Sequence, residues 1–428
     1  MKILLKNCKL VDSVQDYEGI FDVLIDSGRI AKIECSIEEN ADKVINIKGL
    51  TLVPGFIDLH CHLREPGFEH KETIKSGTQA AAKGGFTTVC SMPNTNPVID
   101  NIDALMDLTN IIKKDSAIEV IPIGAITKGQ KGKESADLIG LYEKGIKLFS
   151  DDGHPVWDNS IMFNCLKSSK EKNVLIIDHC EDIGLVDGGV INQGETAERL
   201  GLRGISGLSE ELPIMRDIML AEAANAHIHI AHISTAKSLC IIKEAKAKGI
   251  DVSCEVTPHH ISLCDDDIIP DDTSYKVNPP LRTKKDVDAL QDGLKDGTID
   301  IIATDHAPHS QQDKPRDFYK AANGISGIEI AFSICYSYLV RTGKLSLKEL
   351  LKKMSKNPSE ILNLNKGCIE EGKPADLAVI DLERNFLVDK EKFVSKGKNT
   401  PFHERELWGE VLMTISEGRI VYEKEGEF

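Results

Sequence analysis

Between residues 55 and 365, short apolar runs rich in β-branched residues alternate with longer segments that are apolar at helical spacing. Such runs predict buried strands, and the segments between them predict helices that cover the strands. The pattern repeats about eight times, with strands predicted in FIDLHCH, TTVCSMPN, IEVIPIGAI, IKLFSDD, VLIIDHC, HIHIAHI, VSCEVTP and IDIIATD. Parallel strands joined by helices in this number indicate an α/β protein built as a closed (β/α)8 barrel, the TIM-barrel fold. A doubly wound open sheet is the alternative, but no G-x-G-x-x-G motif follows the first strand.

Both ends of the chain show a different pattern. Residues 1–54 and 366–428 contain alternating strands and tight turns without a helical period, as in DVLIDSGRIAKI and TISEGRIVYE. The turns Ser-Gly-Arg-Ile and Glu-Gly-Arg-Ile are alike although they lie at opposite ends of the chain. We therefore expect both termini to build one small β-sandwich, which divides the chain into residues 1–54, 55–365 and 366–428.

Composition and charge exclude several classes of protein. The 428 residues are 41% hydrophobic and 28% charged, as in an ordinary globular chain, and the formal net charge is -16. Because an acidic surface repels phosphate backbones and anionic lipids, we expect no nucleic-acid or membrane partner. The opening MKILLKNCKLVDSVQD becomes polar too soon for a signal peptide, which favours a cytoplasmic location. The 11 cysteines include no C-x-x-C pair and indicate reduced thiols rather than disulfides or a thiolate zinc site.

Two histidines lie at the end of the first predicted strand, in the stretch GFIDLHCHLREPG. Alternate side chains of a strand share a face, so His60 and His62 are expected to point into the barrel while Leu59 and Cys61 point toward the helices. Barrel enzymes place their active sites at the carboxyl ends of the strands. An H-x-H pair in this position is suited to binding a metal ion.

Other predicted strands also end in metal-binding residues. The motifs SDDG, DHCE, AHIS and ATDHAPH place Asp151 and Asp152, His179, His232 and Asp305 where an apolar run meets its loop. Burying several imidazoles and carboxylates at one barrel mouth is costly unless a cation compensates for it. Six nitrogen and oxygen ligands exceed what one zinc ion usually takes, so we expect two zinc ions that share a carboxylate and a water. The predicted ligands are His60, His62, Asp152, His179, His232 and Asp305.

The residue that bridges the two ions is open to two interpretations. Asp152 is in phase with Leu148 and Ser150 of the fourth strand, whereas Lys147 has the opposite phase. In a regular strand only one of these two side chains can face the metals. We favour Asp152, and the alternative bridge is Lys147 carbamylated by carbon dioxide.

The remaining histidines have simpler interpretations. His227 and His229 are out of phase with His232, so we expect them to face the helix layer. Asp58, which is in phase with His60, is a candidate for orienting a metal ligand from below. Exposed or supporting positions are expected for His70, His154, His259, His260, His306 and His403.

A further set of polar residues follows the same strand ends. Arg64, Asn94, Asn278 and His309 lie just past predicted strands, in HLREPG, SMPN, VNPPLR and DHAPH. An arginine with amides and an imidazole at one pocket mouth is suited to binding a small carboxylate. A surface salt bridge is the alternative for Arg64. We favour the carboxylate clamp because the neighbouring metals make this pocket functional.

Taken together, the motifs resemble those of the bacterial dihydroorotases of the amidohydrolase superfamily, in the class with a bridging aspartate. They are DLHCHLREPGFEHKETI, GGFTTVCSMPNTNPV, FSDDG, DHCED, EVTPHH, NPPLR, ATDHAPH and SKGKNTPF, which span nearly the whole chain. The resemblance implies zinc-dependent, reversible hydrolysis of (S)-dihydroorotate to N-carbamoyl-L-aspartate in de novo pyrimidine (UMP) biosynthesis. It also implies two zinc ions per subunit, one of which can be weakly occupied, a homodimer, and association with aspartate transcarbamoylase.

The resemblance also assigns roles to residues. The six predicted metal ligands match the family's ligands, and Asp305 matches its catalytic residue as well. In the implied mechanism a metal-bound hydroxide attacks the ring amide carbonyl, while Asp305 accepts a proton and passes it to the ring nitrogen. A loop contact to the substrate falls at Asn323 and Gly324, where the family usually has Phe-Gly, so this contact is expected to differ. Further positions that hold substrate are matched by His62, Arg64, Asn94, Asn278 and His309.

Two alternative functions share many of these features. A dihydropyrimidinase, hydantoinase or allantoinase has the same barrel and metals but needs no arginine for a substrate carboxylate, so Arg64 argues against it. An inactive dihydroorotase-like scaffold for aspartate transcarbamoylase is expected to have lost metal ligands. Here the full set of ligands is present.

Overall fold

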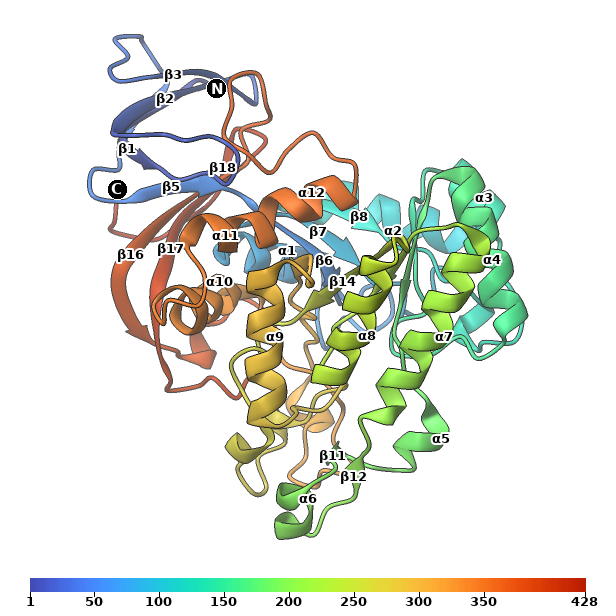
Figure 1. Cartoon of the computed structure of the whole chain (residues 1–428). Helices are drawn as coiled ribbons and strands as arrows, with labels where there is room; N and C mark the ends of the chain where they lie inside the picture. Colours follow the sequence, from blue (N-terminus) through green and yellow to red (C-terminus); the bar gives the residue numbers. More distant parts are fainter.

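The computed structural model describes residues 1–428 and contains parallel strands in the interior with helices outside them (Figure 1). Each of the eight predicted strand segments overlaps one of these strands. Three form one sheet: β6 (Phe56–Cys61), β7 (Phe86–Ser91) and β8 (Glu119–Pro122). Five form a second sheet: β9 (Leu148–Phe149), β10 (Leu175–Asp178), β13 (Ile228–Ile230), β14 (Val252–Val256) and β15 (Ile301–Ile302). The protein is therefore of the α/β class, with parallel sheets.

Two isolated parallel bridges connect the two sheets at both of their edges. Gly124, just past β8, pairs with Phe149 of β9. Cys61 of β6 pairs with His306, a few residues past β15. The pairing order consequently continues from β8 to β9 and returns from the end of β15 to β6.

The helices pack around these strands, and a core of 57 buried residues includes the side chains between the two layers. Local sequence fixes several helix starts, as where the Thr73 side chain accepts a hydrogen bond from the Ser76 amide at the start of α1. The helix predicted from EELPIMRDIMLAEAAN is α7. The helices are α1 (Ile74–Lys83), α2 (Ile102–Asp115), α3 (Leu138–Glu143), α4 (Asn159–Lys172), α5 (Ile183–Val186), α6 (Glu195–Leu200), α7 (Leu208–Ala224), α8 (Ala236–Ala247), α9 (Lys284–Asp296), α10 (Ala331–Cys335), α11 (Leu347–Leu351) and α12 (Asn357–Ile361). A short ribbon of β11 (Ile191–Asn192) and β12 (Gly204–Ile205) lies outside this arrangement.

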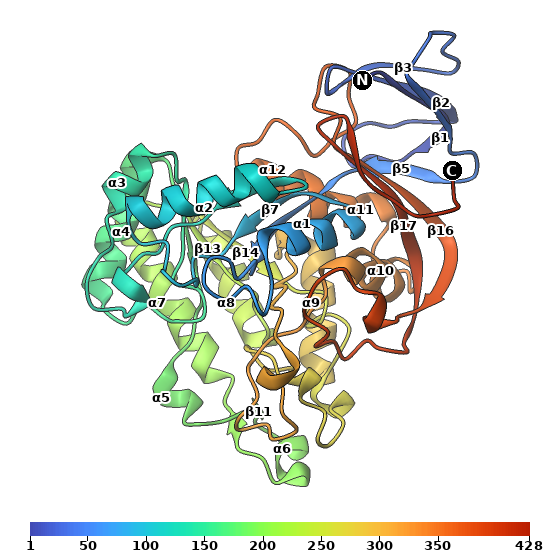
Figure 2. The same cartoon turned by 180° about the vertical axis from the view of Figure 1, so that it is seen from behind.

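Strands from both ends of the chain form one further sheet, which Figure 2 shows beside the helical part with both termini on it. Its order is β18-β17-β16-β5-β1-β2-β3, and β4 also pairs with β1. These strands are β1 (Ile3–Leu10), β2 (Ile20–Asp26), β3 (Arg29–Glu34), β4 (Lys43–Asn46), β5 (Thr51–Pro54), β16 (Leu377–Leu387), β17 (Glu406–Ser416) and β18 (Arg419–Glu423). The strands of the two termini thus pair as a single sheet rather than as two.

The two similar turns noted in the sequence meet in this sheet. Gly28 and Gly418 have φ angles of 81° and 73°, a region that favours glycine. A Cβ atom on Gly418 would lie 2.6 Å from the Cα of Gly28, so a side chain there would force the turns apart. A separate core of 16 buried residues, drawn mainly from these strands, holds the sheet together.

The helices are all too short or too polar to cross a lipid bilayer.

Candidate functional site

The predicted metal ligands converge where the parallel strands end, and Asp152 lies at their centre. Its Oδ1 is 3.2 Å from His60 Nε2, 3.5 Å from His179 Nδ1 and 3.4 Å from His232 Nε2. Its Oδ2 is 3.4 Å from His62 Nε2. One carboxylate therefore lies within 3.5 Å of all four predicted histidines.

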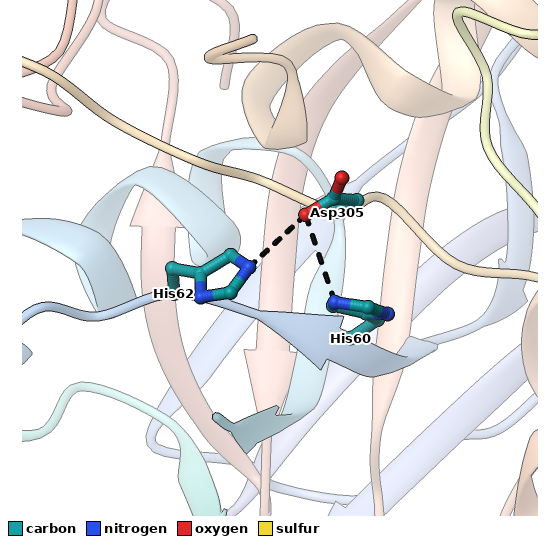
Figure 3. A group of neighbouring side chains, drawn as sticks. All are labelled: His60, His62 and Asp305. Atoms are coloured by element: carbon teal, nitrogen blue, oxygen red, sulfur yellow. Dashed lines mark hydrogen bonds and ion pairs between the residues drawn. The ribbon is translucent and has the colours of Figure 1, made fainter. Parts of the chain in front are cut away.

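Asp305 also contacts the first histidine pair, His60 and His62. Its Oδ1 is 3.1 Å from His62 Nε2 and 3.6 Å from His60 Nε2. Figure 3 shows both imidazoles directed at this one oxygen, with the second carboxylate oxygen pointing away from them. His60, His62 and Asp305 thus form a compact group of buried metal-ligating atoms, and His60, Asp152 and His232 form another.

Two atoms of this cluster lack the partners that buried polar atoms normally have. His60 Nε2 and Asp152 Oδ1 are buried, and although they lie 3.2 Å apart neither makes a hydrogen bond. Leaving such atoms unpaired costs free energy, because they lose water without gaining another partner. A cation among nitrogen and carboxylate ligands would satisfy them, and divalent ions such as zinc accept this donor set. The residues present therefore fit a metal centre.

Lys147, the alternative bridge, lies elsewhere. It is exposed at the start of β9, and its ammonium group lies 4.1 Å from the ring centroid of Tyr142. Asp151, which precedes the central carboxylate, also turns away from the cluster. Its Oδ1 accepts hydrogen bonds from the amides of Ile126 and Thr127.

A cavity of about 220 Å³ opens above the cluster. Every residue predicted for metal or substrate lines it except His60, which is buried beneath. The lining comprises His62, Arg64, Asn94, Asp152, Gly153, His179, His232, Asn278, Asp305, Ala307, His309, Asn323 and Gly324. A polar cavity of this size suits a small molecule with several hydrogen-bonding groups.

Arg64 is the only arginine that lines this cavity, and it forms no ion pair within the chain. Its Nε donates to the carbonyl of Pro308 at 3.3 Å, and its Nη2 lies 3.4 Å from His309 Nε2. Arg64 has a φ of 62°, in the left-handed region that is unfavourable for residues other than glycine. The guanidinium is held over the cavity as a cation without a carboxylate partner.

His309 and the loop at Asn323 form the opposite wall. His309 Nε2 donates to the carbonyl of Asn323 at 2.8 Å, so the Asn323 backbone rather than its side chain fixes the ring. Burial, together with Arg64, Lys314 and Lys71, lowers the pKa of His309 to about 2, which keeps the imidazole neutral. At Gly324, φ is 141° and a Cβ would lie 2.7 Å from that of Ala307. This wall requires a glycine.

Glu255 in β14 supports the metal-ligating cluster and was missed by the sequence analysis. Its Oε1 is 2.6 Å from His60 Nδ1, and its Oε2 is 3.1 Å from His229 Nε2. Burial opposes ionisation, but His60 and His229 lower the pKa of Glu255 to about 2. The carboxylate accepts a hydrogen bond from His60 Nδ1–H and so directs Nε2 toward Asp152 and Asp305. A glutamate within the apolar run VSCEV was the available signal.

The prediction that His229 faces the helix layer is therefore wrong. It lies on the same side as Glu255, with its Nδ1 2.7 Å from Ser253 Oγ.

Asp58 also has a different partner from the one expected. It accepts hydrogen bonds from the Thr304 amide and hydroxyl, and so fixes the backbone next to Asp305 rather than an imidazole.

We expect Glu255→Gln to weaken zinc binding by about 10- to 100-fold, as is usual when a carboxylate behind a metal-binding histidine is removed. The amide keeps the shape but loses the charge that fixes the His60 tautomer. Titrating metal-free protein with zinc against a competing chelator measures the change. Glu244→Gln, an exposed glutamate on α8, serves as the control and should bind zinc like the wild type. Equal affinities for all three proteins would contradict the role given to Glu255.

Sequence comparison connects the chain with known hydrolases. Residues 49–238 match the dihydro-orotase-like family, and residues 219–422 match the amidohydrolase family. The dihydroorotase of Thermoanaerobacter sp. is 47% identical over 425 residues, covering 99% of this chain and 98% of that protein. The dihydroorotase of Acetivibrio thermocellus is 46% identical over 419 residues, covering 98% of each chain.

Solved structures of cyclic-amide hydrolases have a similar fold. The L-hydantoinase (dihydropyrimidinase) from Arthrobacter aurescens superposes with a TM-score of 0.89 at 25% sequence identity, covering 99% of this chain and 96% of that chain. A dihydropyrimidinase from Brevibacillus agri gives a TM-score of 0.88 at 26% identity with the same coverage.

Proposed function

Because the chain belongs to the dihydroorotase family, we propose that it hydrolyses (S)-dihydroorotate reversibly to N-carbamoyl-L-aspartate, a step of pyrimidine biosynthesis. The observation that carries this proposal is the unpaired guanidinium of Arg64 at the edge of a cavity lined by metal-ligating residues. Dihydroorotate is a cyclic amide with one carboxylate. It needs a cation to bind the carboxylate and a metal site to hydrolyse the ring amide.

We propose that two zinc ions bind here, with Asp152 between them. His60, His62 and Asp305 would hold one ion, and His179 and His232 would hold the other. The unpaired atoms His60 Nε2 and Asp152 Oδ1 support this assignment, as does the central place of Asp152 among the four histidines. When bound, such ions activate a water for attack at neutral pH and polarise the carbonyl that is attacked.

Asp305 is proposed as the proton carrier. Burial raises the pKa of its carboxyl, but the charges of His60 and His62 outweigh burial and hold the pKa below its ordinary value. Asp305 is therefore ionised at neutral pH and able to accept a proton. Its Oδ2 points away from both imidazoles (Figure 3), so this oxygen takes the proton of the attacking water and delivers it to the departing ring nitrogen.

The substrate carboxylate is proposed to bind Arg64, with Asn94 and Asn278 as further donors. Asn94 Oδ1 lies 3.0 Å from His62 Nδ1, which turns its amide NH2 away from that ring. Asn278 Nδ2 donates to Glu181 Oε1 at 2.9 Å, so this side chain is held in place before substrate arrives. Ordered donors of this kind orient the ring amide over the reacting groups at little entropic cost.

Hydrolysis of a neutral cyclic amide is the second candidate, since hydantoinases and dihydropyrimidinases have a similar fold. These names describe substrates without a carboxylate on the ring. A buried or half-buried arginine with no ionic partner is costly, and an anionic substrate offsets that cost. Arg64 therefore favours dihydroorotate.

Arg64→Met tests this choice. We expect KM for dihydroorotate to rise about 10- to 100-fold with a smaller change in kcat, because hydrogen bonds to a charged group contribute about 1.5–3 kcal/mol. Steady-state kinetics with dihydroorotate and with neutral dihydrouracil measure the effect. Arg316→Met, an exposed arginine in the loop past His309, is the matched control and should behave like the wild type. An unchanged KM, or wild-type protein that prefers dihydrouracil, would favour the second candidate.

We also propose that the strands from β6 to β15 form a closed (β/α)8 barrel. The parallel bridges Gly124–Phe149 and Cys61–His306 support closure at both sheet edges. The proposed domain limits are residues 1–54 and 366–428 for the β domain and 55–365 for the barrel. The separate core of 16 residues among the terminal strands supports this division.

A further inference from the structure

A second cavity adjoins the substrate cavity, and His309 lines both of them. Its volume is about 340 Å³, and no hydrophobic residue lines it. Ten residues form its lining, of which Glu391 is the only acidic one. Four are lysines, which define what we call the lysine pocket: Lys314, Lys390, Lys396 and Lys398.

The lysines of this pocket have no carboxylate partner. Nearby lysines outside it do form ion pairs, as Lys392 does with Asp389 at 3.6 Å and Lys71 with Asp313 at 3.5 Å, but none of the four pocket lysines does. With four lysines and one glutamate, the pocket has a net charge of +3, whereas the whole chain carries -16. Cations that gather without anions in an acidic protein indicate a site for an anionic ligand.

Backbone carbonyls, which carry no net charge, hold three of these ammonium groups. Lys314 Nζ donates to the carbonyls of Thr273 and Lys276 at 3.0 and 2.9 Å. Lys396 and Lys398 likewise donate only to backbone carbonyls. Burial and, after it, the charge of Lys276 lower the pKa of Lys314 to about 7, a cost that a bound anion would offset. The cations are therefore held in place but not neutralised.

The segment SKGKNTPF supplies two of the pocket lysines and has no role in the proposed function. Its Asn399 also lines the pocket and accepts a hydrogen bond from the His309 amide at 2.9 Å. Asn399 Nδ2 donates to the carbonyl of Gly324 at 2.9 Å. Because His309 and Gly324 line the substrate cavity, this segment joins the lysine pocket to the wall of that cavity.

We propose that the lysine pocket binds a small polar molecule that carries two phosphoryl groups. Lysines bind phosphoryl oxygens as point charges, whereas planar recognition of a carboxylate favours arginine, and no arginine lines this pocket. Two phosphoryl groups carry about -3 to -4 at neutral pH, which matches the charge of the pocket. The absence of apolar lining leaves no surface on which a nucleobase can stack, so the rest of the ligand is polar, as in a sugar bisphosphate.

Isothermal titration calorimetry of the metal-loaded protein with fructose 1,6-bisphosphate tests this proposal. The phosphoryl groups of this probe are too far apart to chelate one zinc ion together. We expect saturable binding with a dissociation constant below about 1 mM. Fructose 6-phosphate, the same sugar with one phosphoryl group, should bind about 10-fold more weakly, because it loses its contacts to half of the lysines. Neither titration requires turnover, so the result is independent of the proposed function.

Two substitutions test whether the lysines form the site. Lys390→Gln and Lys396→Gln should each weaken the binding of fructose 1,6-bisphosphate by about 10-fold, the usual effect of losing a hydrogen bond between charged groups. Lys392→Gln is the matched control, since this lysine is only two residues from Lys390 but lies outside the pocket with its side chain 81% exposed. It should bind the probe like the wild type. Circular dichroism checks that each variant is folded.

Lysine acetylation followed by mass spectrometry locates the ligand on the wild type, without any substitution. Bound fructose 1,6-bisphosphate should slow the labelling of Lys390 and Lys396 and leave that of Lys392 unchanged. Absence of saturable binding, equal affinity for the two sugars, or folded variants that bind like the wild type would each overturn the proposal. So would a ligand that protects none of the pocket lysines from acetylation.

Discussion

Replacing Asp305 by asparagine is expected to lower kcat for dihydroorotate by about a thousandfold, within the ~10²–10⁴ that general acid–base catalysis contributes. The asparagine keeps an oxygen near His60 and His62 but cannot take up a proton. Asp305 is proposed both as a metal ligand and as the proton carrier. Metal content measured on the same preparation distinguishes loss of zinc from loss of proton transfer, and the variant should retain most of its zinc. Both directions of the reaction should slow equally, because one group serves as base in one direction and as acid in the other.

The matched control is Asp317→Ala, which removes an exposed carboxylate from the loop that follows. It should change neither kcat nor zinc content. A zinc-replete Asp305→Asn protein with normal kcat would show that another group moves the proton. A variant that loses its zinc would show that asparagine cannot replace Asp305 as a metal ligand, and the kinetic argument would then have to rest on zinc-reconstituted protein.

Asp152→Ala is expected to lose at least one of the two proposed zinc ions and essentially all activity. Its carboxylate contacts four imidazoles, so its removal leaves those rings without their shared partner. Zinc content by mass spectrometry, together with activity at saturating zinc, measures the effect. Added zinc is expected to restore little activity, because the bridging position itself is gone.

Lys147→Ala is the comparison that decides between the two bridges of the sequence analysis. Lys147 is exposed and lies over Tyr142, so its removal should affect neither zinc content nor kcat. If Lys147→Ala instead lost zinc and short carboxylic acids rescued it, a carbamylated lysine would be the bridge and Asp152 would not.

The strand pattern was predictable because buried parallel strands are continuous apolar runs with few alternatives. All eight predicted segments overlap a parallel strand, and helix α7 begins within two residues of its predicted start. Pairing between distant strands was harder to predict. In the sheet, β5 lies between β1 and β16. This order depends on which strand edges pair, and neither the turn residues nor the apolar pattern of the sequence encodes that pairing.

The site was predictable to the extent that strand ends share one edge, which places Asp152, His179 and His232 near the first histidine pair. Phase arguments failed at His229 for a physical reason. The strand β13 ends at Ile230, and His232 has a φ of 28°, outside the extended region. Alternation of faces holds only in extended backbone, so the phase of His232 says nothing about His229. Glu255 was missed because its strand was treated as purely apolar.

The position of β5 between β1 and β16 has a consequence for biosynthesis. Pro54 pairs with Leu377, so the amino-terminal strands leave the ribosome long before their neighbours exist. Until then β5 presents an open edge, and open edges recruit foreign strands. In the nascent polypeptide, the edge of β5 therefore depends on protection by a chaperone or by rapid folding of the intervening region. This protection is needed until β16 is translated and pairs with β5.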